Sequence, residues 1–367
     1  MRLYWTETEN FRLLEPQRVE FSPGVNVITG ENAQGKTTLL EAVYLLTGGK
    51  SFRANYDREL IAFDKERAVL SGGFHAAARD QKIELTFARG RSRQIKLNGV
   101  RTPAAELRGA LHAIIFSPDD LGLVRGPAAG RRKLMDAAIS QLRPGYGALL
   151  ADFGRVYENK LRILKDWREK PSLLEPLDEF NRQLAVYSAR LIRYRAAFAG
   201  KLAEAAAPIH REFAAGREEL AVAYTTVSTV EDPKASERDI FEAVWERQRT
   251  LRQAELDAGS CLVGAHKDYL AIAINGTDAR AFASQGQTRT AALSIKLAER
   301  EIFLGDTGEM PVLLLDDVLS ELDAARQDFV LNRIGGGQTL VTSCNGESVS
   351  RLLQGRVLRM EKGRVFE

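Results

Sequence analysis

The sequence predicts an α/β fold whose two halves are separated along the chain by a helical insertion. Three observations indicate this fold. A strand, a glycine-rich loop and a helix follow one another over residues 24–49, an apolar strand over 311–317 ends in two carboxylates, and residues from about 122 to 255 have helical periodicity. We expect residues 1–120 and 259–367 to form two parts of one head domain, and residues 121–258 to form a helical lid.

The composition excludes several classes of protein. The chain of 367 residues has 44% apolar side chains and a net charge of +3, as is ordinary for a globular protein. It lacks the roughly 18 consecutive apolar residues of a membrane span and the apolar segment of a signal peptide. Two cysteines, Cys261 and Cys344, are too few for a disulfide framework or a zinc site. We therefore expect a cytoplasmic protein with no membrane contact, and the net charge alone does not indicate nucleic acid.

The first strand, loop and helix match a phosphate-binding loop. Glycines at both ends of the loop let successive N–H groups face the β- and γ-phosphates of a nucleotide, the lysine adds a mobile positive charge, and the next hydroxyl can bind Mg²⁺. An accidental glycine-rich turn is the alternative. The predicted nucleotide-binding residues are Gly30, Glu31, Asn32, Ala33, Gln34, Gly35, Lys36, Thr37 and Thr38, with Thr37 also a metal ligand.

Two further patterns fill the chain after this loop. Side chains alternate between apolar and polar over residues 83–87 and 95–100, which predicts strands, with Asn98-Gly99 as a hairpin turn. Apolar residues recur at intervals of three and four from Leu177 to Phe198, which predicts one helix of a compact antiparallel bundle. About three heptads are too few for a long coiled-coil arm.

The phosphate-binding loop is one half of the expected nucleotide site, and the second half follows the apolar strand at 311–315. Asp316 at the strand tip is expected to hold Mg²⁺ through water, and Asp317 is placed to orient an attacking water molecule. An apolar strand that ends in acids is common by itself. Its pairing with a phosphate-binding loop makes it a strong indication of a nucleotide-hydrolysing site.

A third segment offers an anion site at the start of a helix. Ser284, Gln285, Gly286 and Gln287 precede a helix whose N–H groups can bind a γ-phosphate, although a plain Ser/Gln helix cap is the alternative. Residues 320–323 then lead into another helix, where Asp323 can be merely an N-cap.

The order of these segments resembles that of the ABC ATPases that act on chromosomes, the SMC, Rad50 and RecF group. Within that group the chain is most similar to the RecF family, bacterial recombination mediators. The segments that carry the resemblance are Asn10-Phe11-Arg12, the loop at 30–37, the blocks at 116–121, 131–136, 264–268 and 283–289, the pair Asp316-Asp317, and residues 320–323.

The resemblance implies an ABC-type P-loop ATPase head with a mixed β-sheet and a helical lid, and ATP and Mg²⁺ as cofactors. It implies catalysis by Lys36, Asp316 and Asp317, metal binding by Thr37 and Asp316, and nucleotide contacts from residues 284–287 and Asp323.

The resemblance also implies an ATP-dependent homodimer that closes on DNA. The DNA expected is duplex and junctions of double and single strands at gaps, with single strands as a further form. A weak, DNA-stimulated ATPase would release that DNA. The implied partner is a RecR-type mediator, and the implied roles are recombinase loading, replication restart and SOS induction.

Departures from the family pattern leave alternatives open. Most ABC enzymes have Glu where this chain has Asp317, no glutamine matches a Q-loop, and the segment 342–344 has no switch histidine. These features favour slow turnover. The alternatives are a nucleotide-gated scaffold with a vestigial ATPase, or the ATPase subunit of another ABC-type complex. The block at 264–269 has Ala, Lys and Tyr where the family has Pro, Arg and Asp, so the roles of His266 and Lys267 stay open. Basic clusters at 89–101, 131–133 and 190–195 are read as DNA contacts or as solvated faces.

Overall fold

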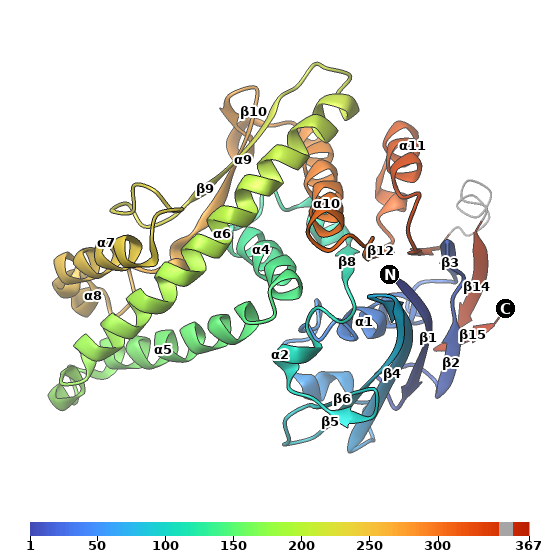
Figure 1. Ribbon diagram of the computed structural model, residues 1–367, viewed down its shortest axis with the longest axis horizontal. Helices are drawn as coiled ribbons and strands as arrows, with labels where there is room; N and C mark the ends of the chain where they lie inside the picture. The colour runs from blue at the N-terminus through green and yellow to red at the C-terminus, as the bar shows by residue number, and fades with distance from the viewer. Residues whose placement is uncertain (345–354, 367) are drawn as a thin grey trace.

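The protein, analysed as a computed structural model, has an α/β head with an elongated helical lid on one side (Figure 1). The structure describes residues 1–344 and 355–366. The expected α/β class with a helical lid is confirmed. None of the helices in these described ranges is long and apolar enough to cross a membrane.

A six-stranded, mostly parallel sheet forms the centre of the head. Its order is β15-β14-β3-β13-β12-β8. A single strand, β13, therefore lies between β3, which precedes the glycine-rich loop, and β12, which ends in carboxylates. Both predicted strands are confirmed. The strands are β3 Val25–Thr29, β8 Ala113–Phe116, β12 Val312–Asp316, β13 Thr339–Ser343, β14 Arg356–Glu361 and β15 Arg364–Phe366.

The two faces of this sheet belong to different apolar cores. Along β12, Leu313 and Leu315 join the core that continues into the lid, whereas Val312 and Leu314 join the core of the N-terminal half. Alternate residues of a strand point to opposite faces, so a continuous apolar run serves both cores. The central sheet therefore links the head to the lid.

An antiparallel sheet covers the N-terminal half and packs beside the first helix, α1 Lys36–Leu45. The predicted hairpin is confirmed: Asn98 and Gly99 have φ of 52° and 82°, which a two-residue turn between β6 and β7 requires. The strand order of this antiparallel sheet is β2-β1-β4-β5-β6-β7. The strands are β1 Arg2–Glu9, β2 Gln17–Glu20, β4 Arg67–Ala76, β5 Arg79–Ala88, β6 Gln94–Leu97 and β7 Val100–Arg101.

The lid is built on one long helix, α6 Leu177–Phe213, which contains the predicted apolar repeat and packs against α5. A strand, β9 Leu220–Thr225, interrupts the stretch that was expected to be helical, and its first four residues alternate between buried and exposed. It pairs with β10, from the C-terminal side of the predicted boundary at 258. The remaining lid elements are α4 Ala128–Leu142, α5 Tyr146–Asp166, η2 Pro171–Leu174, α7 Glu237–Thr250, α8 Arg252–Ala258, η3 Ala265–Lys267, β10 Tyr269–Ile274, β11 Thr277–Asp278 and α9 Ala279–Phe282.

One long helix connects the lid to the head, and short helices lie between other elements of the chain. The long helix is α10 Gln285–Thr307, which packs against α6 (Figure 1). The others are η1 Asp57–Leu60, α2 Ala104–Leu107, α3 Pro118–Leu121, η4 Leu319–Glu321 and α11 Ala324–Arg333.

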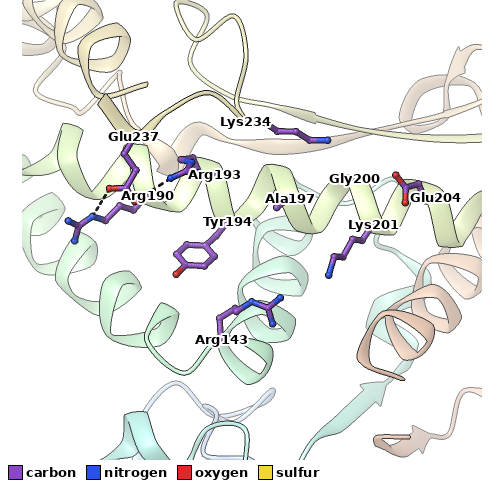
Figure 2. A pocket seen from close by; sticks show the side chains of 10 residues that line it. All are labelled: Arg143, Arg190, Arg193, Tyr194, Ala197, Gly200, Lys201, Glu204, Lys234 and Glu237. Carbon is purple, nitrogen blue, oxygen red and sulfur yellow. Dashed lines mark hydrogen bonds and ion pairs between the residues drawn. The ribbon is translucent and has the colours of Figure 1, made fainter. Parts of the chain in front are cut away.

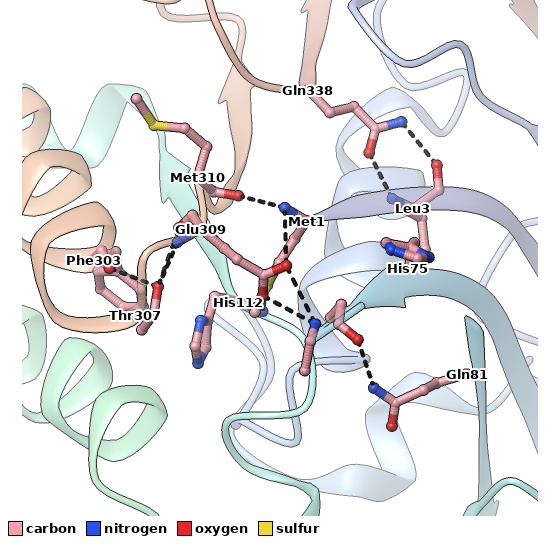
Figure 3. A network of polar contacts seen from close by, with 12 residues as sticks. Met1, Leu3, His75, Gln81, His112, Phe303, Thr307, Glu309, Met310 and Gln338 are labelled. Carbon is pink, nitrogen blue, oxygen red and sulfur yellow. Dashed lines mark hydrogen bonds and ion pairs between the residues drawn. The ribbon is translucent and has the colours of Figure 1, made fainter. Parts of the chain in front are cut away.

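The N-terminus is fixed to the C-terminal half by polar contacts (Figure 3). The buried amide of Gln338, just before β13, accepts from Leu3 N at 2.7 Å and donates to Leu3 O at 2.8 Å. Glu309 lies 3.9 Å from the Met1 amino group and accepts a hydrogen bond from Ala77 N. The contacts of Gln338 with Leu3 join the two parts of the head across 335 residues of sequence.

A buried arginine holds the lid together. Arg195 on α6 pairs with Asp136 on α4 at 2.9 Å and with Asp268, before β10, at 2.9 Å. Asp268 is fully buried and also accepts hydrogen bonds from Tyr224 and Thr226. Burial raises the pKa of Asp268, and the Arg195 charge opposes that rise. Arg195 therefore belongs to the lid core and not to a solvated basic face.

We predict that Arg195→Ala lowers the free energy of unfolding by about 3–5 kcal/mol, because it leaves two carboxylates without their cation. Urea unfolding of the full chain measures this. Arg238→Ala is the control, because within the described residues this exposed guanidinium pairs with Glu242 on its own helix, and we expect no measurable change. Equal effects of the two substitutions would contradict the role given to Arg195.

Candidate functional site

The glycine-rich loop turns between β3 and α1 in a conformation that its glycines permit. Gly30 lies so close to β14 that a Cβ there would be 2.3 Å from the Met360 carbonyl oxygen. Gly35 has φ of 112° and precedes the first residue of α1. A side chain at either position would displace the loop, so the sequence pattern reflects a steric need.

Lys36 points back across this loop. Its ammonium group donates to Gly30 O at 2.5 Å and to Glu31 O at 2.8 Å, and it lies 3.4 Å from Cys344 Sγ. The Cys344 thiol in turn donates to Asn32 Oδ1 at 2.9 Å. A cation held at the loop, beside the N-terminus of a helix, is suited to bind phosphate oxygens.

The two distant half-sites meet at Asp316. Its Oδ1 accepts from the Thr37 hydroxyl at 2.8 Å and from the Thr342 hydroxyl at 2.9 Å. Burial raises the pKa of Asp316, and hydrogen bonds from the two threonines oppose the rise. A hydroxyl and a carboxylate at this distance are the hard oxygen donors that Mg²⁺ prefers, so these residues fit an Mg²⁺-nucleotide site.

Asp317 has an uncommon backbone for a residue with a side chain. Its φ is 52°, and its N–H donates to the Thr342 hydroxyl at 2.9 Å. One of its carboxylate oxygens, Oδ1, is buried and has no hydrogen-bond partner in the described part of the chain. Left-handed backbone in a non-glycine residue often occurs at functional sites.

The side chains at the start of α10 form a helix cap. The Ser284 hydroxyl accepts from Gln287 N at 3.2 Å, and Gln287 Oε1 accepts from Ser284 N at 2.8 Å. This capping box is the Ser/Gln helix cap that the sequence offered as the alternative interpretation, and the helix begins at Gln285. Among the described residues no hydrogen bond or ion pair joins 284–287 to the glycine-rich loop.

The start of α10 is instead tied to the segment after Asp317. Arg326 donates to Gly286 O at 3.1 Å and to the Thr290 hydroxyl at 3.2 Å, and it pairs with Asp323. Arg289 donates to Glu321 O at 2.8 Å. Asp323 is the N-cap of α11, as the alternative interpretation predicted.

Sequence reasoning missed a buried network beside the site. Arg12 forms two contacts with the fully buried Glu41 on α1, at 2.7 and 2.9 Å. Glu41 also accepts from the Ser51 hydroxyl, and Ser51 Oγ accepts from Arg53 N at 2.9 Å. The Arg53 charge lies close enough to oppose the raised pKa of Asp316. The segment Asn10-Phe11-Arg12 was noticed in the sequence, but its partner was not.

Several residues of the noted basic clusters and blocks have internal roles. Arg131 is buried and donates to three backbone carbonyls within residues 123–126, and Arg93 pairs with Asp57. His266 packs on Tyr157 in the lid, and burial lowers its pKa to about 4. These positions stabilise the fold and lie apart from Asp316.

Comparison with known proteins gives one consistent result. The family model described as the RecF/RecN/SMC N terminal domain matches residues 3–364. A protein of Listeria monocytogenes named DNA replication and repair protein RecF is 39% identical, over 97% of each chain. A protein of the same name from Clostridium acetobutylicum is 35% identical over 98% of each chain.

Solved structures agree with this result. The structure described as the recombination mediator protein RecF-ATPrS in the RecFOR pathway has a TM-score of 0.91 and 35% identity, covering 99% of this chain and 97% of its own. The Smc head domain of Pyrococcus furiosus has a TM-score of 0.55 at 16% identity, covering 100% of this chain and 95% of its own, which shows a shared fold only. The chain therefore belongs to the RecF family, within the RecF, RecN and SMC group of ATPase-head proteins.

Proposed function

We propose that this chain is an ATP-dependent DNA-binding protein of recombinational repair and replication restart. The observation that carries the proposal is the 2.8 Å contact between Thr37 and Asp316, which joins a phosphate-binding loop to a metal-binding carboxylate 279 residues away. ATP binding closes a homodimer on DNA, and slow hydrolysis reopens it.

In this proposal each residue of the site has a separate task. Backbone N–H groups over 30–38 and the Lys36 ammonium bind the phosphates, while Thr37 and Asp316 hold Mg²⁺, which when bound offsets phosphate charge. Asp317 orients a water molecule, as its unpartnered Oδ1 supports. An aspartate reaches less far than a glutamate, which fits slow turnover.

The start of α10 acts on the nucleotide of a second subunit. The absence of a polar contact between 284–287 and the loop at 30–38, among the described residues, supports this arrangement. N–H groups of Gln285 and Gly286, together with Ser284, would meet the partner's γ-phosphate, and Asp323 would lie beside it. Binding two ATP molecules between two subunits favours the closed state over the open one, as a nucleotide switch requires.

Arg326 transmits changes between these two segments within one subunit. It holds the Gly286 carbonyl and the Asp323 carboxylate together, so a shift of the segment after Asp317 moves the start of α10. The site's metal-binding strand and the trans-acting helix are thereby coupled.

The biological setting is carried over from the relatives. Their names describe DNA replication and repair proteins and a recombination mediator of the RecFOR pathway. We propose that this chain binds duplex DNA and junctions at gaps, works with a RecR-type mediator in the cytoplasm, and assists recombinase loading and SOS induction. A nucleotide-gated scaffold is the second candidate, because Asp317 replaces the usual glutamate.

We predict that Lys36→Arg lowers ATP hydrolysis by about a hundredfold or more, because the bulkier guanidinium does not fit among the loop carbonyls. Hydrolysis is measured with no DNA, duplex, single strand or gapped duplex at two salt concentrations, because phosphate contacts are salt-sensitive. Lys65→Arg, in an exposed loop, is the control. A rate that no DNA raises would contradict DNA gating, and ATP binding without hydrolysis would favour the scaffold.

We predict that a non-hydrolysable ATP analogue converts the chain from monomer to dimer, as measured by light scattering after size exclusion. Ser284→Arg should remain monomeric while it binds the analogue, because a long cation blocks the approach of the partner's loop. A wild-type monomer at saturating analogue would contradict the proposal.

We predict that Arg326→Gln weakens analogue-driven dimerisation by about tenfold or more, because charged hydrogen bonds to Gly286 and Asp323 are lost. Binding of a fluorescent ATP to the monomer should not change. Arg249→Gln, an exposed residue of α7, is the control. Loss of nucleotide binding itself would show that Arg326 acts on the loop and not on the dimer.

A further inference from the structure

A basic hollow of about 600 Å³ lies on the lid beside α6 (Figure 2). Residues from α6, from the end of α4 and from the segment before α7 line it. The nucleotide site does not use this hollow. The lining residues that bear on its chemistry are Arg143, Arg190, Arg193, Tyr194, Lys201 and Lys234.

The hollow is open because one stripe of α6 carries small residues. Ala197 and Gly200 follow Tyr194 at intervals of three on the same helix face. A Cβ at Gly200 would lie 3.3 Å from Lys234 Nζ, so the glycine lets this lysine approach the helix.

An exposed aromatic ring points into this space. Tyr194 is 41% exposed, and in Figure 2 its ring extends from α6 toward the region of Arg143. The Tyr194 and Tyr146 rings form a T-shaped pair with their centroids 5.4 Å apart and an interplanar angle of 79°. Tyr146 is fully buried and hydrogen-bonded to Asp136, so the exposed ring is held in one orientation.

The positive charge around the ring is only partly neutralised. Arg190 and Arg193 share Glu237, at 3.3 and 3.5 Å. Arg143 and Lys201 in turn share one carboxylate, that of Asp306.

Lys234 Nζ and the Glu204 carboxylate have no polar partner in the described ranges. Five cations therefore face three carboxylates in and beside the hollow. The pairs of Arg190 and Arg193 with Glu237 are exposed, and exposed ion pairs contribute little energy, so a phosphate group can replace this carboxylate at low cost.

We propose that this hollow binds single-stranded DNA, with a base stacked on Tyr194 and the backbone phosphates along the basic side chains. A basic groove with an aromatic platform is the arrangement that binds single strands without sequence preference. Bases of a duplex are stacked inside it and cannot reach the ring. The inference rests on the proposed DNA-binding function and adds a second contact, one that recognises the single-stranded side of a junction.

The test compares Tyr194→Leu with Tyr194→Phe in the full chain, using fluorescent oligodeoxythymidine and a short duplex with a non-hydrolysable ATP analogue. We expect the leucine variant to lose about fivefold or more in affinity for the single strand and none for the duplex, because only stacking is removed. The phenylalanine variant should bind like the wild type. Phe63→Leu, which removes an exposed ring from the head, is the matched control.

A direct readout accompanies the affinities. An oligonucleotide with 5-iodouracil should cross-link on irradiation to the peptide that contains Tyr194. Unchanged single-strand affinity in the leucine variant, or cross-linking only elsewhere, would overturn the inference. Equal losses for single strand and duplex would overturn the stacking role. If the wild type binds duplex but not single strand, only the claim that the hollow binds single-stranded DNA is refuted. If the wild type binds neither, the proposed DNA-binding function is refuted as well.

Discussion

The hydrogen bonds that meet at Asp316 are the constraint on which the rest of the molecule depends. They require β3, β12 and β13 to lie in one sheet, although a lid of more than a hundred residues separates the first from the other two. Parallel strands place their carboxyl ends at one edge, so the loop after β3 and the carboxylate after β12 meet there. The buried Gln338 amide, which fastens β1 to the same region, supports this closure.

The lid must be rigid for such a site to work between two subunits. The pairs formed by Arg195 tie α4, α6 and the segment before β10 together, and α10 packs along α6. The start of α10 is also held by Arg326. The same Arg195 and Asp136 hold Tyr146, whose ring packs against Tyr194, so one buried network lies behind the basic hollow.

The nucleotide half of the site could be predicted from the sequence because its residues are contiguous and their spacing has a steric cause. The glycines of the loop, the strand before Asp316 and the Asn98-Gly99 hairpin are local features. The other features of the fold and the site could not be predicted, because they depend on contacts between residues that are distant in the sequence. Arg195 sits in a run of basic residues that reads as a solvated face, and only the fold shows its buried carboxylates. β9 was missed because a short strand follows a very long helix. The Ser/Gln cap at Ser284 was one of two interpretations, and only the structure shows its reciprocal hydrogen bonds.

The central claim is that each ATP site is completed by a second subunit, and mixing two inactive variants tests it most directly. Lys36→Ala lacks a working loop, and Ser284→Ala weakens the helix start without adding a cation that blocks the partner's loop, so each alone should hydrolyse ATP far more slowly than the wild type. In a mixed dimer, the intact helix start of one subunit faces the intact loop of the other. Hydrolysis should therefore return when the two variants are mixed. A mixture as inactive as its components, although mixed dimers form, would contradict it.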